Sequence, residues 1–446
     1  MSDWKAQLAN ARVLVVGCGA TGASAARFAA AAGAKVRVVD SRENPPAADA
    51  LARDWPSIGI VVGGLDPATL MGIDHVVVSP GVDLREPLIE AAREAGHEII
   101  GDIEWFARVA NAPAIAITGS NGKSTVTAWA GEIAAASGRR VAVGGNFGTP
   151  ALDLLADDVD LYVLELSSFQ LELTERLACV AATVLNISAD HIDRHGSLEH
   201  YAELKARIFR AADTALVNAD DARVAAMNTY NARVASFGSA ETADYRLLEA
   251  HDGLWLARGD EPWLETRRLP LAGRHNAANA AAVWALTDTL GIDDATIREG
   301  LQSFKGLPHR CQLVAEIDDV RWVDDSKGTN VGAMLASLNG MDAPAVLLAG
   351  GQGKGADFTE LGPVAGQHAR AVIVFGEDAD KIAAAVSAYV PVERVATLEA
   401  AVRRAADIAR AGDVVLLSPG CASFDQFDNY MARGEAFSAA VRELAA

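Results

Sequence analysis

The chain has 446 residues, of which 50% are hydrophobic and 22% are charged, a composition that predicts about three folded domains and excludes a mainly disordered chain. Its 39 Lys and Arg against 59 Asp and Glu give a net charge of −20, which argues against binding to nucleic acid or to an anionic membrane surface. The four cysteines are far apart, the first residues lack a signal-peptide layout, and no apolar run approaches the roughly 18 residues of a membrane span. We therefore expect a cytoplasmic protein without structural zinc, disulfides or membrane insertion.

Short apolar runs alternate with Ala-rich stretches along the whole chain, a rhythm typical of α/β domains with parallel sheets. We expect a Rossmann-like first domain at residues 1–101, a central P-loop-type domain at 102–305 and a Rossmann-like third domain at 306–446. The first domain's predicted elements are, in chain order, a strand at 12–16, a helix at 23–32, strands at 35–39 and 75–78, a helix at 86–95 and a short strand at 97–100.

The second domain opens with a helix that starts at 101–104 and ends near 111–113. Its expected strands are 114–117, 141–143, 161–164, 182–185 and 215–217, and its later helices are 200–212 and 275–290. Residues 233–271 alternate over short stretches, which predicts small antiparallel strands. The third domain follows a hinge at Leu307-Pro308-His309, with strands at 321–323, 345–348, 371–374 and 413–417.

The strongest motif is Thr118-Gly-Ser-Asn-Gly-Lys-Ser-Thr125, which follows a predicted strand and opens a predicted helix. Its two glycines let backbone N–H groups approach phosphate oxygens, and the helix N-terminus adds the positive end of its dipole. Lys123 suits the β- and γ-phosphates of ATP, and Ser124 or Thr125 suits Mg²⁺. The usual Walker spacing has glycine where this chain has Ile117, so the loop is a variant. The alternative is an ordinary Gly/Ser turn that contains a lysine.

A second glycine-rich turn, Gly17-Cys-Gly-Ala-Thr-Gly22, also lies between a strand and a helix. Asp40 ends the next strand, at the distance typical of an acidic residue that binds a ribose. Taken alone this pattern indicates NAD and a dehydrogenase. The same helix N-terminus also suits the diphosphate of another nucleotide, or a turn made only for packing.

Three more features of the central region carry chemistry. Glu165 follows the strand 161–164, where α/β sheets place their ligands, and is a candidate for Mg²⁺. His191 lies in an Asp- and His-rich segment after another strand, and no third soft ligand indicates zinc. Lys205 shares one helix stripe with Tyr201 and Phe209, which would desolvate its amine and lower its pKa. The alternative for Lys205 is a side chain that reaches solvent.

In the third domain, cations and hydroxyls follow three predicted strand ends and the hinge, a pattern that suits a small acidic substrate. The segments are Leu307–Arg310, Asp324–Asn330, Gly350–Gly355 and Ser418–Asp425.

Together these motifs resemble the Mur ligase family, the ATP-dependent amino-acid ligases of peptidoglycan precursor synthesis, over essentially the whole chain. Further matching segments are Gly144–Asn146, Leu164–Gln170, Asp190–His191, His275–Asn276 and Asp325–Lys327. Within the family, the resemblance implies addition of D-glutamate to UDP-N-acetylmuramoyl-L-alanine. The alternatives are L-glutamate or another amino acid as acceptor and, more remotely, a nicotinamide-dependent dehydrogenase.

The resemblance also implies roles for residues. The UDP-linked substrate would contact Gly19, Ala20, Thr21, Asp40, Arg42, Asn146 and Ser167. ATP would contact Gly119, Ser120, Asn121, Gly122, Lys123, Ser124, Thr125, Asn276, Arg310 and Asp325. The incoming amino acid would contact Lys327, Thr329, Lys354, Ser423 and Tyr430. Two Mg²⁺ ions would be held by Ser124, Glu165, His191 and Lys205 as its carbamate. With Lys123, the last three are the implied catalytic residues.

The chemistry of such a ligase follows from the weakness of a carboxylate as an electrophile. Attack of the carboxylate on the γ-phosphate of ATP would make an acyl phosphate, which the amine of glutamate then displaces through a tetrahedral intermediate. The expected partners are these small molecules alone, without nucleic acid, and a monomer is expected. Two departures from the relatives are Gly328, which we expect to loosen its turn slightly, and Tyr430, where phenylalanine is commoner.

Overall fold

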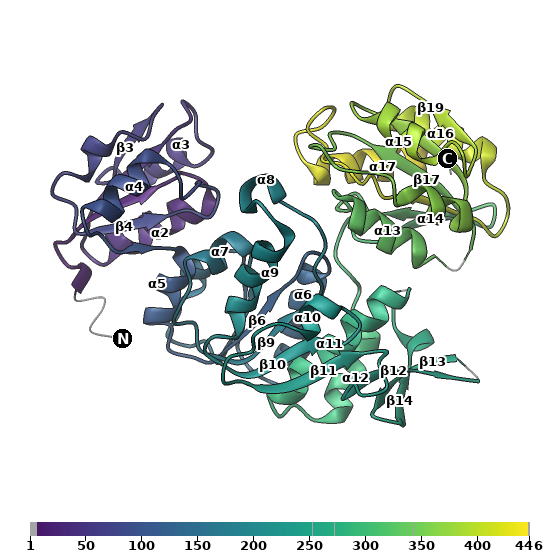
Figure 1. The fold of residues 1–446 in the computed structure, drawn as a ribbon, viewed down its shortest axis with the longest axis horizontal. Helices are drawn as coiled ribbons and strands as arrows, with labels where there is room; N and C mark the ends of the chain where they lie inside the picture. The colour runs from purple at the N-terminus through teal and green to yellow at the C-terminus, as the bar shows by residue number, and fades with distance from the viewer. Residues whose placement is uncertain (1–6, 252, 272, 342, 445–446) are drawn as a thin grey trace. The chain divides into compact units, whose positions relative to one another are not determined.

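The computed structural model describes residues 7–251, 253–271, 273–341 and 343–444, so the chain start considered for a signal peptide lies outside the described residues. The described residues have an α/β fold and form three sheets (Figure 1). The described residues form two compact units, one lying within 1–248, 257–261 and 281–300 and the other within 249–256, 262–280 and 301–446. Within the described residues, no helix has the length and apolar character needed to cross a membrane.

The first sheet has the strand order β3-β2-β1-β4-β5, and all its pairings are parallel. Its strands are β1 Arg12–Val16, β2 Lys35–Asp40, β3 Gly59–Val62, β4 His75–Val78 and β5 Ile99–Ile100, and its helices include α2 Ala20–Ala31, α3 Ala48–Asp54 and α4 Pro87–Glu94. This order is that of a Rossmann-type half, as predicted. Sequence reasoning missed β3, an edge strand whose side chains are largely exposed.

The second sheet has the order β14-β13-β12-β11-β10-β9-β6-β8-β7. Its strands are β6 Ala114–Thr118, β7 Val141–Gly145, β8 Leu161–Glu165, β9 Cys179–Val184, β10 Ala212–Asn218, β11 Arg233–Gly238, β12 Tyr245–Ala250, β13 Gly253–Arg258 and β14 Glu261–Glu265. The accompanying helices include α5 Asp102–Val109, α6 Lys123–Ala136, α7 Ser168–Glu172, α8 Ile192–His195, α9 Leu198–Ala206, α11 Arg274–Thr289 and α12 Asp294–Ser303.

Two predictions in this region are wrong in part. The segment 233–271 was expected to hold small antiparallel strands, which is wrong for its first two strands, because β11 pairs parallel to β10 and β12 pairs parallel to β11. The connection from β10 to β11 carries the short helix α10, Ala222–Ala225, and such a crossover returns the chain in the same direction. The helix expected at 200–212 ends at Ala206, continues as a 3₁₀ turn over Arg207–Phe209 and gives way to β10.

The third sheet has the order β15-β16-β20-β17-β18-β19. Its strands are β15 Gln312–Ile317, β16 Val320–Asp324, β17 Ala345–Gly350, β18 Ala369–Phe375, β19 Val392–Arg394 and β20 Val414–Leu417. The helices α13 Val331–Asn339, α14 Leu361–His368, α15 Ala379–Val386, α16 Leu398–Ile408 and α17 Tyr430–Leu444 accompany them. Alternate residues of β17 enter two separate hydrophobic clusters, so both faces of this sheet are buried.

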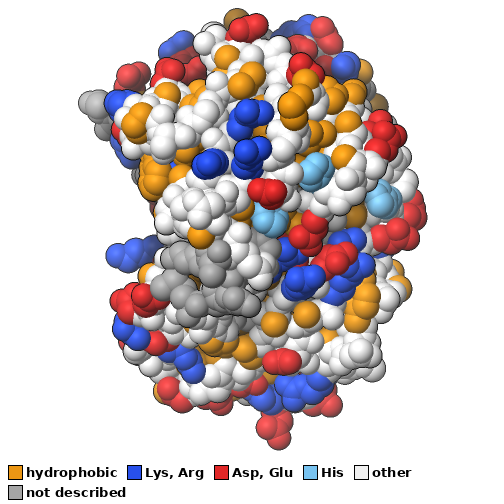
Figure 2. Space-filling view, turned by 90° about the vertical axis from the view of Figure 1, so that its left-hand side faces the viewer, with side chains coloured by type: hydrophobic (Ala, Val, Ile, Leu, Met, Phe, Trp, Pro, Cys, Tyr) orange, Lys and Arg blue, Asp and Glu red, His pale blue; other side chains and the backbone are white. Residues whose placement is uncertain are grey.

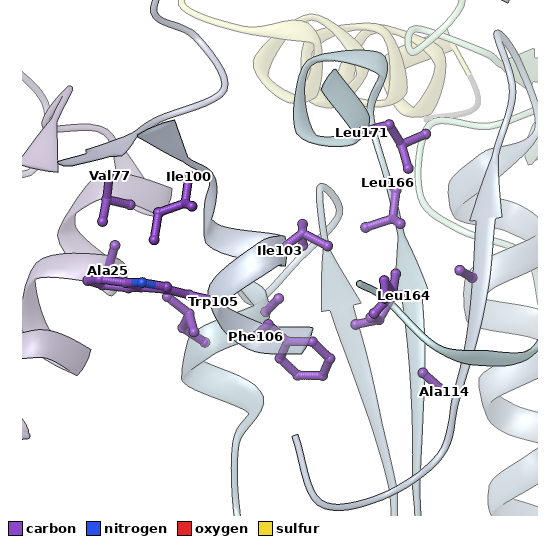
Figure 3. Packing of buried hydrophobic residues seen from close by; sticks show 14 of the residues in the cluster. Ala25, Val77, Ile100, Ile103, Trp105, Phe106, Ala114, Leu164, Leu166 and Leu171 are labelled. Carbon is purple, nitrogen blue, oxygen red and sulfur yellow. The ribbon is translucent and has the colours of Figure 1, made fainter. Parts of the chain in front are cut away.

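Side chains of helix α5 pack in one hydrophobic cluster with residues of the first sheet and of the second sheet (Figure 3). Trp105 lies 5.7 Å from the ring of Phe28 in α2, and Phe106 meets Tyr162 of β8 edge-on at 4.9 Å. Both side chains are fully buried. Truncation of Phe106 to alanine would cost about 3–5 kcal/mol. The start of α5, and with it Asp102, is therefore held firmly.

Acidic and basic side chains are interspersed with scattered hydrophobic ones on the face drawn in Figure 2. Several Lys and Arg side chains gather in the upper middle of that face, with acidic and histidine side chains beside them.

Candidate functional site

Three loops that carry predicted site residues leave neighbouring strands at the same edge of the second sheet. β6 lies between β8 and β9 and pairs parallel to both. The carboxyl ends of these strands lead into the loop 118–125, the segment 165–170 and the segment 185–191. Parallel strands place such ends side by side, which is where α/β sheets bind ligands.

The loop 118–125 has the geometry of a phosphate cradle. Gly119 and Gly122 both have positive φ, at +151° and +83°, and Gly122 is the N-cap of α6. A Cβ on Gly119 would come within 3.0 Å of the Cβ of Leu185, so only glycine fits there. Nζ of Lys123 donates hydrogen bonds of 2.9 Å to the carbonyl oxygens of Gly119 and Ser120. This arrangement holds a cation over a helix N-terminus, as phosphate binding requires.

Asn186 braces this loop from the end of β9, a contact that sequence reasoning missed. Its Oδ1 accepts from the backbone N of Asn121 at 2.8 Å, and its Nδ2 donates to the carbonyl oxygen of Asn121 at 3.1 Å. The backbone N of Ser120 donates to the carbonyl oxygen of Asn186 at 2.9 Å. The available signal was an asparagine at a strand end directly before the Asp- and His-rich segment.

The structure brings Ser124 and Glu165 together. The hydroxyl of Ser124 donates to Oε2 of Glu165 at 2.5 Å, and Nδ2 of Asn146 donates to Oε1 at 2.6 Å. Glu165 is 2% exposed. A hydroxyl and a carboxylate beside a phosphate cradle are the hard oxygen donors that Mg²⁺ prefers, so these residues fit the ion. The imidazole of His191 is exposed and instead faces Asp190 and the ring of Phe169.

Within the described residues, no group of three or more His, Cys, Asp or Glu side chains is arranged to hold a metal ion. The expected ligand set differs from such a group, because two of its members are a serine hydroxyl and a modified lysine.

Lys205 is 1% exposed, so the interpretation that its side chain reaches solvent is wrong. Its Nζ lies 4.6 Å from the centre of the Tyr201 ring and donates to Oγ1 of Thr118 at 3.2 Å. Burial lowers the pKa of Lys205 well below its usual value, and the charge of Lys123 lowers it further. Asp190 and Glu165 act in the opposite direction and do not compensate. The amine is therefore prone to be neutral and nucleophilic.

Two glycines of the turn 17–22 have different structural roles, one in packing and one in leaving the backbone accessible. A Cβ on Gly22 would lie 1.9 Å from the carbonyl oxygen of Gly17, so Gly22 permits close packing of turn and helix. A Cβ on Gly19 would meet nothing within 4 Å, so the backbone there is open to a ligand. Ala20 and Thr21 form the first turn of α2 beside it.

The carboxylate of Asp40 is engaged within the protein. Its Oδ2 accepts from the backbone N of Cys18 at 2.7 Å and from Nη2 of Arg42 at 2.6 Å. The hydrogen bonds from Arg42 are the main cause that lowers the pKa of Asp40 to about 2. Asp40 thus ties Arg42 to the glycine turn.

The nucleotide residues expected outside the loop 118–125, namely Asn276, Arg310 and Asp325, belong to the second compact unit, whereas the loop belongs to the first. Asp325 is buried and accepts from the hydroxyls of Ser337 at 2.6 Å and Ser418 at 2.8 Å. Desolvation raises the pKa of Asp325 to about 6.

Gly328 does not loosen its turn as expected. A Cβ at Gly328 would come within 2.7 Å of the Ser418 hydroxyl and 2.8 Å of Oδ2 of Asp325, so glycine permits a tight approach of two loops.

The residues expected to bind the incoming amino acid lie around the loops of the third sheet. Nζ of Lys327 lies 4.5 Å from the centre of the Tyr430 ring, and Nζ of Lys354 lies 5.3 Å from that of Phe424. Ser423 is buried next to Phe424, and the backbone N of Thr329 donates to the carbonyl oxygen of Lys327.

Sequence reasoning missed Arg433, whose side chain is fully buried in α17. Its guanidinium donates to Oγ of Ser326 at 3.0 Å, to the carbonyl oxygen of Ser326 at 2.8 Å and to that of Cys421 at 3.1 Å. It therefore joins the two loops that carry the expected amino-acid site. A single arginine in a helix gives no sequence signal for such a role.

Three family models match successive parts of the chain. They are described as Mur ligase MurD-like, N-terminal domain (residues 11–101), Mur ligase middle domain (117–287) and Mur ligase, glutamate ligase domain (309–421). A protein from Nitrosococcus oceani named UDP-N-acetylmuramoylalanine–D-glutamate ligase is 49% identical over 97% of this chain and 96% of its own length. A protein of the same name from Pseudomonas aeruginosa is 48% identical over 97% of this chain and 98% of its own length.

The fold is also that of a solved UDP-N-acetylmuramate–alanine ligase from Thermotoga maritima, which is 20% identical, with a TM-score of 0.62 over 97% of this chain and 99% of that one. The match of family models to most of the chain and the near-full-length identity to curated relatives establish that the chain belongs to the Mur ligase family.

Proposed function

We propose that the chain is the ATP-dependent ligase that adds D-glutamate to UDP-N-acetylmuramoyl-L-alanine in peptidoglycan precursor synthesis. Full-length identity to relatives of that name supports the choice of reaction. The structural observation that carries the chemistry is the contact between Ser124 and Glu165, which sets two hard oxygen donors against a phosphate-binding loop.

The reaction needs a carboxylate to become an electrophile. In the first step a carboxylate oxygen of the UDP-linked substrate attacks the γ-phosphorus of ATP. The bond between the γ-phosphorus and the bridging β-phosphate oxygen breaks, so that ADP departs and the substrate becomes an acyl phosphate. The backbone N–H groups of the loop and Lys123 hold and neutralise the transferred phosphate in this step. Mg²⁺, when held by Ser124, Glu165, His191 and the carbamate of Lys205, supplies further neutralisation of phosphate charge.

In the second step the amine nitrogen of D-glutamate attacks the acyl carbon. The nitrogen loses a proton to solvent, and the tetrahedral intermediate expels inorganic phosphate, which carries away one former carboxylate oxygen, so that the new bond is an amide. We propose that Lys354 and Ser423 bind the side-chain carboxylate of glutamate, with Lys327, Thr329 and Tyr430 around it. The opposite charge of the lysines and a glutamate carboxylate supports this assignment.

We propose that Lys205 is carbamylated. The neutral amine adds to CO₂, a proton leaves, and an N-carboxylate results. The buried setting of Nζ beside Tyr201 and Thr118 supports the proposal, because it lowers the pKa of the amine.

The UDP-linked substrate is assigned to the open backbone at Gly19, Ala20 and Thr21, to Asp40 and Arg42, and to Asn146 and Ser167. The helix N-terminus at Gly19 suits a diphosphate. The nucleotide of ATP is further assigned to Asn276, Arg310 and Asp325. We also propose the division into domains at 1–101, 102–305 and 306–446, a monomer, and work in the cytoplasm, where ATP is available.

The acyl phosphate is tested by labelling the carboxylate of the UDP-linked substrate with oxygen-18. We expect one labelled oxygen in each phosphate released and none in ADP. Unlabelled phosphate would contradict the mechanism. Loss of both label transfer and turnover in Lys123→Ala, with retained folding, would assign the step to the loop.

A further inference from the structure

Helix α5 carries a buried carboxylate that none of the steps above uses. Asp102 is its first residue and is 2% exposed. Oδ2 of Asp102 accepts a hydrogen bond of 2.9 Å from Nε2 of Gln170, which is also buried. Within the described residues, Oδ1 of Asp102 has no hydrogen-bond partner. Such a carboxylate destabilises a fold, so a role other than stability accounts for it better.

The other end of the Gln170 amide contacts Ser167, which lies two residues after Glu165. Oε1 of Gln170 accepts from the backbone N of Ser167 at 3.1 Å and from its Oγ at 3.3 Å. The backbone N of Gln170 donates to the same Oγ at 3.2 Å. The pair is a capping box at the start of α7, so one amide side chain orients both polar groups of Ser167.

The two ends of the Gln170 amide are nearly equal in shape and opposite in hydrogen bonding. An ionised carboxylate only accepts, so Asp102 selects the Nε2 end and turns Oε1 toward Ser167. With the amide reversed, the Nε2 donor would face the N–H donor of Ser167 and the capping box would be lost.

We propose that Asp102 is a positioning residue for the UDP-linked substrate, because it sets the amide orientation of Gln170 and thereby the direction of the Ser167 hydroxyl. The inference rests on the proposed function, in which Ser167 contacts the muramoyl part. Oγ of Ser167 donates its proton to Oε1 and uses one lone pair for the backbone N of Gln170. Its remaining lone pair is left for the substrate, so Ser167 would accept a hydrogen bond from one of the substrate's N–H or O–H groups.

The test measures the affinity of each variant for UDP-N-acetylmuramoyl-L-alanine by calorimetry without ATP, together with KM for all three substrates. Asp102→Leu removes the acceptor, and we expect Kd and KM for the UDP-linked substrate to rise about tenfold, with KM for ATP and D-glutamate unchanged. Asp102→Asn can present either its acceptor oxygen or its donor nitrogen to Gln170, so it specifies the amide orientation less strictly, and we expect its Kd to lie between those of wild type and Asp102→Leu. In a Gln170→Leu background, Asp102→Leu should have no further effect on Kd.

Glu104→Gln is the matched control. Glu104 lies in the same helix, is also 2% exposed, and accepts from the backbone N of Glu175 at 2.8 Å and of Arg176 at 3.1 Å. This variant should lose stability and keep the wild-type Kd. If Asp102→Leu does not fold, Asp102→Ala takes its place with the same expectations.

A folded Asp102→Leu or Asp102→Ala protein that binds the UDP-linked substrate as tightly as wild type would overturn the inference. So would a further loss of affinity when Asp102→Leu is added to the Gln170→Leu background. Wild-type protein that binds this substrate but does not use D-glutamate would contradict the proposed function and leave the inference standing. Wild-type protein that does not bind it would overturn both.

Discussion

The hydroxyl of Ser124, in the first turn of α6, donates a hydrogen bond of 2.5 Å to Oε2 of Glu165, the last residue of β8. The two residues are 41 positions apart in sequence and meet because β6 and β8 are parallel neighbours. Their contact places a buried carboxylate at the mouth of the phosphate loop, where it is available to a metal ion that accompanies ATP.

Replacement of either partner should impair the reaction without unfolding the protein. Glu165→Gln removes the charge that a divalent ion needs, and we expect kcat to fall at least about 100-fold and the Mg²⁺ requirement to rise. Ser124→Ala should show a smaller loss in the same direction. The measurement is phosphate release across a Mg²⁺ titration.

The matched control for Ser124 is Ser137→Ala at the other end of the same helix, where the hydroxyl donates to the carbonyl oxygen of Ala134. This variant should keep the wild-type Mg²⁺ dependence. A Glu165→Gln protein with wild-type turnover at saturating Mg²⁺ would contradict the assignment.

The two glycines of the first turn should separate binding from folding. A methyl group at Gly19 meets no atom within 4 Å, so Gly19→Ala should fold normally and weaken binding of the UDP-linked substrate. A methyl group at Gly22 would lie 1.9 Å from the carbonyl oxygen of Gly17, so Gly22→Ala should lower the free energy of unfolding by about 1–3 kcal/mol or more. Thermal unfolding and calorimetric titration measure the two effects, and equal loss of stability in both variants would refute the distinction.

Lys205 should carry a carbamate at neutral pH. Surface lysines have pKa values near 10.4 and stay protonated there, whereas burial lowers the pKa of Lys205 well below its usual value. We expect carbon-13 NMR in labelled bicarbonate to show one carbamate signal that Lys205→Gln abolishes. Activity of wild-type protein depleted of CO₂ should recover on addition of bicarbonate. A signal that persists in Lys205→Gln would place the carbamate elsewhere.

Asp325 should make the protein less stable as the pH rises. Its pKa is about 6 in the folded state and near 3.8 in the unfolded state, so the folded state binds more protons between those values. The free energy of unfolding from this group therefore falls as the pH rises through that window, by a few kcal/mol at most. Asp325→Asn should flatten that part of the profile while retaining an acceptor oxygen for Ser337 and Ser418.

Urea unfolding of wild type and Asp325→Asn, compared between about pH 4 and pH 7, measures the difference. Asp102, whose pKa burial also raises to about 6, contributes with the same sign and remains in both proteins. A difference between the two proteins that does not change with pH would show that Asp325 titrates normally.

The predicted strands that hold the site correspond to strands of the structure, because buried parallel strands are continuous apolar runs bounded by glycine turns. β1, β4 and β6 are of this kind, and β8 is a similar buried run that ends at Glu165 without a glycine turn. The edge strand β15 was missed because its polar residues interrupt any apolar run, whereas β3 is a short apolar run beside glycines that was overlooked although its side chains are largely exposed.

The candidate site was predictable where one loop contains the chemistry, as in residues 118–125. It was not predictable where the contact depends on topology. Asp102 and Gln170 are 68 residues apart in sequence, and Ser418 and Asp325 are 93 residues apart. No local sequence pattern could therefore predict either contact. The burial of Lys205 was predictable only in part. The aromatic residues on its stripe of the helix indicated desolvation, whereas the helix alone favoured an exposed amine, and the structure shows a buried one.

The most direct test of the central claim is phosphate release from ATP with UDP-N-acetylmuramoyl-L-alanine, measured in parallel with D-glutamate and with L-glutamate. We expect release that requires D-glutamate. Release with L-glutamate alone would keep the fold and the chemistry and change the substrate, and release with neither would contradict the account.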